Sequence, residues 1–330
     1  MQTVIAMSDF GLAVWSHRIS DFGSEKEIDE HVERLADAGF DLLIPCVKNP
    51  PGAVDFLTDL AEVNESYPEW DPLRVLIDRC SERGLDVHPW FCVFPEGEKS
   101  RLLNEHPEYE AEIDGNRRWA CACRPEVQDY AFDLYRDLAD RYSPPGLHLD
   151  YIRTGGACRC EYCREEMKRR GVDIGSVEWR DPDSEIWANW RASRIADFVT
   201  RVHDLTSGAG MELSAAVFNE YPRSISGQGQ DWVQWAELGI VDYLFPMSYT
   251  NSLLSVVSRT ICHVALVDGR VPVWEGLGKY SSASQLTPEA LGEQIRGVLD
   301  RGADGVVIFH YGAITDDDLE EIGNIRAERT

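Results

Sequence analysis

The chain has 330 residues, a length that suits either two ordinary domains or one large α/β barrel. Its 43% hydrophobic and 27% charged residues are a globular composition, which excludes wholesale disorder, and no apolar run approaches the roughly 18–20 residues of a membrane span. The 58 acidic against 32 basic residues give a net charge of −26, so nucleic acids and anionic membrane surfaces are poor partners.

Apolar runs of period two alternate with segments of period 3.6 along the whole chain. In the first half, strands are predicted over residues 12–15, 42–47, 85–94 and 146–152, and helices over 27–38, 72–84 and 127–142. In the second half, strands are predicted over 213–218, 241–247, 271–274 and 306–309, and helices over 186–205, 232–238 and 253–265. Two further helices are predicted to begin at Pro288 and near Asp316. Asp71 and Thr287, each followed by proline, mark two of the helix starts.

Eight strands, each followed by a helix, favour a closed (β/α)8 TIM barrel that forms a single domain over residues 1–330. A doubly wound open sheet is the alternative, but the Gly-rich phosphate turn that it would want after the first strand is missing. The connections after the third and fourth strands are long, over residues 95–126 and 153–185. Since loops that follow the strands form the active face of this fold, we expect these two to wall one side of a cleft.

Three carboxylates follow predicted strands. Asp150 closes the fourth strand, Glu220 follows the fifth, and Glu275 follows the seventh. Separately each could be a loop charge, a helix cap or, for Asp150, a partner of Arg153. Together they predict a paired acid and base, as glycosidic bond cleavage requires: one carboxyl group protonates the leaving oxygen, and the other attacks the sugar or activates water.

Aromatic and basic side chains near the strand ends suit a sugar cleft, because flat aromatic faces stack on pyranose rings. The candidate substrate-binding residues are Trp15, His88, Trp90, Arg153, Tyr249, Trp274, His310 and Tyr311. Lone histidines are more often core or hydrogen-bonding groups than catalysts, so such a role is the alternative for both histidines. Tryptophans at helical spacing, such as Trp187 and Trp190, are interpreted as packing.

Cysteines gather in the two long loops. Cys158, Cys160 and Cys163 lie after the fourth strand, and Cys121 and Cys123 lie after the third. Four thiolates suit a structural zinc ion, for which Cys123, Cys158, Cys160 and Cys163 are the predicted ligands and Cys121 competes with Cys123. Free thiols or one local disulfide are the alternative; nine cysteines in a chain of this length do not indicate a disulfide framework.

Several motifs resemble the hypothetical glycosyl hydrolase-like family ten, a TIM-barrel group related to the α-galactosidase and α-amylase clans. They are Gly146–Arg153, His88-Pro89-Trp90, Arg124-Pro125-Glu126-Val127, Gln230-Asp231-Trp232, the run 241–249, the turn 276–280 and Phe309-His310-Tyr311-Gly312. The resemblance implies a carbohydrate-active barrel in which Asp150 matches the strand-four nucleophile. An amylase-like arrangement would choose Glu220 as its partner, and an acid on strand seven would be Glu275. An acid on strand six is not available, since Met247-Ser248-Tyr249 holds no carboxylate.

The leading hypothesis is therefore a glycoside hydrolase that needs no cofactor for catalysis, with Arg153 and the aromatic residues positioning the sugar. A carbohydrate-binding barrel without catalysis is the alternative. A metal-dependent hydrolase is a weaker one, because His17 lacks the second histidine of a His-x-His pair. The absence of an export signal in residues 1–14 predicts a cytoplasmic protein, and self-association stays open. The acidity, with only five lysines, suits concentrated salt, although a GC-rich genome would also favour arginine over lysine.

Overall fold

The computed structural model describes residues 10–115, 118–178 and 181–329. Its strands form one parallel sheet in the order β1-β9-β8-β7-β6-β5-β4-β2-β3, and β1 also pairs with β2, so the sheet closes into a barrel. The strands are β1 (Gly11–Arg18), β2 (Leu42–Lys48), β3 (Asp86–Val87), β4 (Trp90–Cys92), β5 (Gly146–Asp150), β6 (Glu212–Phe218), β7 (Tyr243–Met247), β8 (Trp274–Gly278) and β9 (Gly305–Phe309). The predicted (β/α)8 barrel is confirmed.

The third predicted strand is divided in two. Its halves β3 and β4 both pair with β2, and Pro89, which has no N–H to donate to a ladder, lies between them. Together β3 and β4 fill one strand position, so the fourth predicted strand is β5 in the structure. The interpretation of the chain's first residues as free of an export signal depends partly on residues 1–9, which lie outside the described part.

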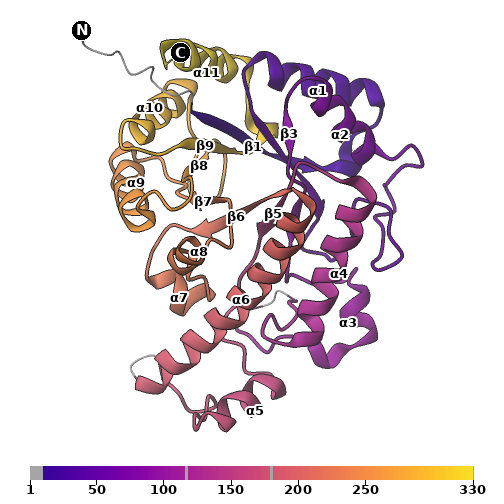
Figure 1. Ribbon diagram of the computed structural model, residues 1–330, viewed down its shortest axis with the longest axis vertical. Helices are drawn as coiled ribbons and strands as arrows, with labels where there is room; N and C mark the ends of the chain where they lie inside the picture. The colour runs from indigo at the N-terminus through magenta and orange to yellow at the C-terminus, as the bar shows by residue number, and fades with distance from the viewer. Residues whose placement is uncertain (1–9, 116–117, 179–180, 330) are drawn as a thin grey trace.

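Helices surround the barrel (Figure 1). They are α1 (Glu25–Asp37), α2 (Pro72–Glu82), α3 (Arg101–Glu105), α4 (Pro125–Tyr142), α5 (Glu161–Arg169), α6 (Pro182–Ala209), α7 (Arg223–Gln228), α8 (Trp232–Leu238), α9 (Leu253–Val267), α10 (Pro288–Leu299) and α11 (Asp316–Arg329). The predicted starts hold, since the Asp71 and Thr287 side chains accept hydrogen bonds from the amides of Arg74 and Ala290. The short helices α3 and α5 were not predicted and lie inside the two long loops.

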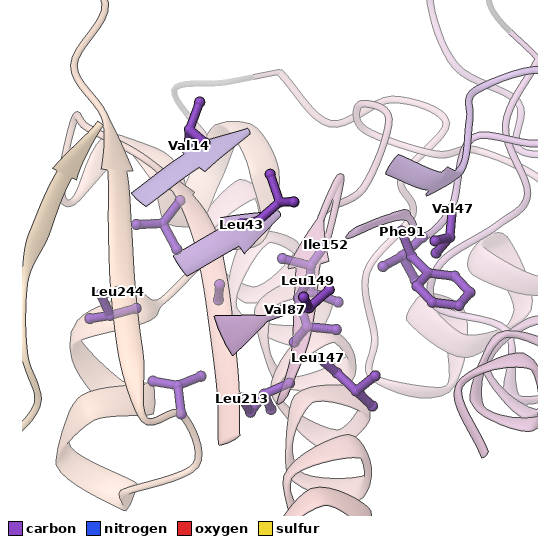
Figure 2. Close-up of a cluster of buried hydrophobic side chains, with 14 of the residues drawn as sticks. Val14, Leu43, Val47, Val87, Phe91, Leu147, Leu149, Ile152, Leu213 and Leu244 are labelled. Atoms are coloured by element: carbon purple, nitrogen blue, oxygen red, sulfur yellow. The ribbon is translucent and has the colours of Figure 1, made fainter. Parts of the chain in front are cut away.

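The main core lies between the strands and the helices. Val14, Leu43, Leu149, Leu213 and Leu244 belong to it and come from five different strands (Figure 2). Neighbouring residues on the strands point the other way, because successive side chains alternate between the two faces of a sheet. They form a second, largely aromatic cluster inside the barrel around Trp15 and Phe245. This alternation decides which strand residues can reach the mouth of the barrel.

One part of the chain stands apart from the barrel. Helix α5 and the first turns of α6 project beyond it (Figure 1). They enclose a separate small core that contains five cysteines, Met167, Trp187 and Trp190. Among the described residues, no helix is long and apolar enough to cross a membrane.

Candidate functional site at the carboxyl end of the barrel

Asp150 is the last residue of β5, at the end of the barrel where parallel strands deliver their carboxyl termini. Its Oδ1 atom accepts hydrogen bonds from the backbone amide of Tyr151 and from Nη1 of Arg153, the latter at 3.2 Å. Tyr151 adopts a left-handed conformation with φ of 49°, which turns the chain at the strand end. Non-glycine residues in this region are uncommon and cluster at functional sites.

The carboxylate is held in a nearly closed environment, and Asp150 is 6% exposed. Burial raises its pKa, while Arg153, the Tyr151 amide and the nearby indole of Trp90 oppose that rise by favouring the charged form. Tyr249 also lies near it: burial raises the pKa of the Tyr249 phenol, and the Asp150 carboxylate adds to that rise. Trp90, Arg153 and Tyr249, three of the predicted substrate-binding residues, are thus gathered around Asp150.

Aromatic rings support Arg153 above this carboxylate. Its guanidinium carbon lies 4.0 Å from the centre of the Tyr151 ring and 5.0 Å from that of Phe218. Such stacking fixes a guanidinium while leaving its N–H groups free to bind oxygen. Arg153 is therefore arranged to hold Asp150 and to present donors beside it.

A hollow of about 580 Å³ opens next to Tyr151. The Trp119 ring forms one wall, with its centre 5.8 Å from that of Tyr151. The hollow is lined by Pro50, Pro51, Pro95, Gly97, Glu98, Arg118, Trp119 and Tyr151. The lining comes from the loops after β2 and β4 and from Tyr151, which directly follows β5. Of the two long loops that were predicted to wall a cleft, residues 95–126 therefore line this hollow and residues 153–185 do not, whereas the loop after β2 was not predicted to take part.

The sequence analysis missed Trp119, Tyr151 and Phe218 in this region. Only Tyr151 carried a signal, because it follows Asp150 directly. Trp119 lies within a long loop and Phe218 ends a strand like any core aromatic, so neither could be assigned before the loops were placed.

Glu220 lies two residues beyond the end of β6, the strand next to β5. Its carboxylate is exposed and forms an ion pair with Arg223 at 3.0 Å. Glu220 is thus at the predicted end of the barrel, but no contact holds it against Asp150.

The structure places Glu275 elsewhere. Glu275 is the second residue of β8, not the residue after a strand, because β8 begins at Trp274 and continues through Gly278. Its side chain points outward to α9, where Oε2 lies 3.0 Å from Nδ1 of His263, and it is fully buried. Glu275 therefore cannot share a cleft with Asp150 in this structure.

Two predicted sugar-binding residues lie at the opposite end of the barrel. Trp274 starts β8 and packs against Gly305, the first residue of the neighbouring strand β9, and against Gly11, the first residue of β1 on the far side of β9. His88 is 1% exposed, and its ring packs against Gly146, the first residue of β5. This corrects the expectation for both residues: the strand alternation brings them inside the barrel, but near its amino-terminal end.

The remaining three predicted residues are dispersed. Trp15 is 2% exposed inside the barrel, and its indole N–H donates to Nε2 of His148 at 3.1 Å. Tyr311 lines a different hollow with His31 and accepts a hydrogen bond from Arg34. His310 lines a third, beside Lys279 and Tyr280. The aromatic residues therefore do not form the single sugar cleft that the sequence predicted.

The cysteines of the two long loops do lie together, but one of the four differs from the predicted ligand set. The Sγ atoms of Cys121, Cys158, Cys160 and Cys163 all lie within 4.8 Å of one another, and all four residues are buried. Cys123, the predicted fourth ligand, is buried nearby but is outside this set. Cys121 takes the place for which both residues competed.

The fold and the site place this protein in the class of closed parallel β/α barrels. An acidic residue and aromatic side chains are gathered at the carboxyl end of its strands. A family model described as Glycosyl hydrolase-like 10 matches residues 12–265. The chain belongs to this family.

The chain is also similar to curated proteins that are named glycosyl hydrolases. The glycosyl hydrolase DigH of Escherichia coli (strain K12) is 23% identical over 206 residues, which cover 55% of this chain and 47% of DigH. The chain thus spans about half the length of the curated relatives it matches.

Solved structures show the same barrel. The PgaB (BpsB) glycoside hydrolase domain of Bordetella bronchiseptica superposes with a TM-score of 0.77 at 14% identity, covering 97% of this chain and 98% of that one. The α-L-fucosidase isoenzyme 2 of Paenibacillus thiaminolyticus superposes with a TM-score of 0.72 at 17% identity, covering 97% of this chain and 49% of that one. At these identities the likeness establishes the fold.

Proposed function

We propose that this protein is a glycoside hydrolase that cleaves O-glycosidic bonds, with Asp150 as its nucleophile or base. The observation that carries the proposal is a buried carboxylate at the carboxyl end of a barrel strand, held by Arg153 beside an aromatic-walled hollow. Membership of a glycosyl hydrolase-like family supports it. A carbohydrate is the substrate class, because the rings of Trp119 and Tyr151 line the hollow and the Arg153 guanidinium beside Asp150 has N–H donors for hydroxyl groups.

The surroundings of Asp150 suit a carboxylate that must be ionised to act. A nucleophile or base loses its function when it is protonated, and burial alone would favour the protonated form. The Arg153 guanidinium and the Tyr151 amide counteract burial by stabilising the negative charge. Asp150 therefore combines partial desolvation with support for its charged state, as an attacking carboxylate requires.

Glu220 is the better candidate for the general acid. Glu275 is sealed into its pair with His263 behind the barrel wall, whereas Glu220 is exposed at the end of the neighbouring strand. Glu98 is a further carboxylate that lines the hollow. The acid must reach the leaving-group oxygen, and both residues are on the correct side of the barrel for that task.

Leaving-group dependence separates these roles. The test is a screen of aryl glycosides of both anomers, followed by kcat/KM of the variants Asp150→Asn, Glu220→Gln and Glu98→Gln on a poor leaving group (phenyl) and a good one (2,4-dinitrophenyl). Loss of a general acid slows the poor leaving group by roughly 10²–10⁴-fold and hardly affects the good one, which departs without a proton. Loss of the attacking carboxylate slows both.

We expect Glu220→Gln to show the first pattern and Asp150→Asn the second, with Glu98→Gln as the matched comparison. If Glu98→Gln shows the first pattern and Glu220→Gln does not, Glu98 is the acid. No turnover of any glycoside by the wild-type protein, together with saturable sugar binding, would contradict the hydrolase proposal.

That last outcome defines the second candidate, a carbohydrate-binding barrel without catalysis. A specific observation favours it, since neither predicted partner carboxylate is held against Asp150. Isothermal titration with oligosaccharides, using Asp150→Asn as control, would then show binding that does not depend on this carboxylate.

A further inference from the structure

The cysteine cluster lies in the small core that stands apart from the barrel. Helix α5 has nine residues and buries only Cys163 and Met167, so its own apolar surface is small. The core that it helps to enclose is made of five cysteines and a few large side chains, and it is separate from the main hydrophobic core. Small cores of this kind are commonly stabilised by a metal ion or by disulfides.

The sulfur positions match a metal site and not disulfides. Sγ of Cys121 lies 3.5 Å from Sγ of Cys163 and 3.9 Å from Sγ of Cys158. In tetrahedral zinc tetrathiolate, with Zn–S bonds of about 2.3 Å, neighbouring sulfurs are about 3.8 Å apart. A disulfide would bring two of them to about 2.05 Å.

A buried cation lies beside the cluster. Arg191 of α6 is 3% exposed, and its guanidinium carbon lies 5.3 Å from the centre of the Trp187 ring, which belongs to the same small core as the cysteines. Its Nη atoms donate to Oγ1 of Thr154 at 3.2 Å and to the carbonyl of Ser226 at 2.7 Å, whereas its buried Nε has no acceptor among the described residues. Four thiolates and one Zn²⁺ carry a net charge of −2, so a buried arginine at this place is a compensating charge.

We propose that Cys121, Cys158, Cys160 and Cys163 bind one structural Zn²⁺ ion. Four thiolate ligands select a soft or borderline ion such as zinc, and they fill a tetrahedron without leaving a position for water or substrate. The role is therefore structural. The ligand set differs from the one predicted from sequence, because Cys121 replaces Cys123.

The ion joins the two loops that border the candidate active site. Cys121 comes two residues after Trp119, which walls the hollow, and Cys158 comes eight residues after Asp150 in the next loop. Without a metal the four thiols have only weak sulfur contacts with one another. Metal binding fastens the insert that carries α5 to the wall of the hollow, independently of the reaction that takes place there.

Metal analysis with paired cysteine variants tests the site. We expect about one zinc per chain by inductively coupled plasma mass spectrometry in the purified wild type and in Cys123→Ser, and loss of that zinc in Cys121→Ser and in Cys163→Ser. Cys123→Ser is the matched control because it removes an equally buried thiol two residues from Cys121.

A second measurement covers variants that fail to fold. Wild-type protein stripped with a chelator is titrated with Co²⁺ and then with Zn²⁺, and its insert is probed by limited proteolysis. We expect the visible absorption of tetrahedral thiolate-bound cobalt at one equivalent, displacement by Zn²⁺, and protease protection that returns with metal. Zinc retained by Cys121→Ser but lost from Cys123→Ser, iron in place of zinc, or no uptake by the stripped protein would each overturn the proposal.

Discussion

At the scale of single residues, Asp150 is a carboxylate on which opposing influences act. Burial raises its pKa, whereas Arg153, the Tyr151 amide and Trp90 favour ionisation. The functional role of this carboxylate was predictable from the sequence, because folding does not need a carboxylate at the strand end. The contacts that hold the Asp150 carboxylate were less predictable. They depend on the left-handed conformation of Tyr151 and on the stacking of Arg153 over two aromatic rings.

The opposing influences predict a pH effect. Replacing Arg153 with methionine removes the positive charge that favours the Asp150 carboxylate, so the pKa of Asp150 rises further. The acidic limb of the kcat/KM–pH profile, where activity disappears as Asp150 becomes protonated, should therefore move to higher pH. Arg153→Lys, which keeps the charge, should move it less. A limb that stays in place or moves to lower pH in Arg153→Met would show that Asp150 is not the group that titrates.

At the scale of elements, most strands and helices follow from hydrophobic period and capping residues, but β8 does not. The apolar alternation of Val271 and Val273 predicted a strand over 271–274, and Gly276-Leu277-Gly278 was interpreted as a turn. In the structure these glycines are strand residues. A Cβ on Gly276 would contact the Pro246 carbonyl and Trp15, and one on Gly278 would contact Ser284 and Tyr249. Glycine is required there because large neighbours fill the barrel interior, and no sequence period reveals that.

The same packing makes a prediction at the other end of the barrel. A Cβ added to Gly11 would lie 2.0 Å from Cζ2 of Trp274, so Gly11→Ala forces the indole or the strand to shift. We expect the free energy of unfolding to fall by about 1–3 kcal/mol or more. Gly208→Ala is the control: Gly208 is within α6 with open space around it, and alanine should add about 0.5–1 kcal/mol. Urea unfolding of both variants measures the difference, and equal stabilities would contradict this account of the interior.

At the scale of the whole molecule, barrel closure was predicted by the count of alternating elements, but the grouping of side chains at its mouth was not. Trp274 and Tyr311 both looked like walls of one cleft, and they lie at the amino-terminal end and in a separate hollow. Which loops lie side by side depends on their long-range packing. That information is spread over many residues, and local patterns do not contain it.

The net charge of −26 also acts on the molecule as a whole. Self-repulsion of this size destabilises a compact state, and salt weakens it because the screening length falls from about 10 Å at 0.1 M to about 3 Å at 1 M. We expect the Tm to rise as KCl is increased over this range, despite the weakening of surface ion pairs. A sucrose series controls for stabilisation by excluded solutes. A Tm that stays constant or falls in KCl would leave genome composition as the explanation of the acidic, lysine-poor chain.

The most direct test of the central claim compares two carboxylates that the sequence predicted as equals. Their variants, Asp150→Asn and Glu275→Gln, are measured for kcat/KM on an aryl glycoside turned over by the wild type, and for Tm, at a pH near 6. Burial opposes protonation of His263, but the Glu275 carboxylate and the Asn219 carbonyl outweigh it and raise its pKa. The stabilisation from that raised pKa is fully present below the unfolded value of about 6.5 and is lost as the pH rises through the folded value.

We predict opposite outcomes for the two variants. Asp150→Asn should lose activity by roughly 10²–10⁴-fold or more while its Tm is retained. Glu275→Gln should lose about 3–5 kcal/mol of stability, because it breaks a buried pair, while its folded fraction keeps its activity. Full activity in folded Asp150→Asn would contradict the account.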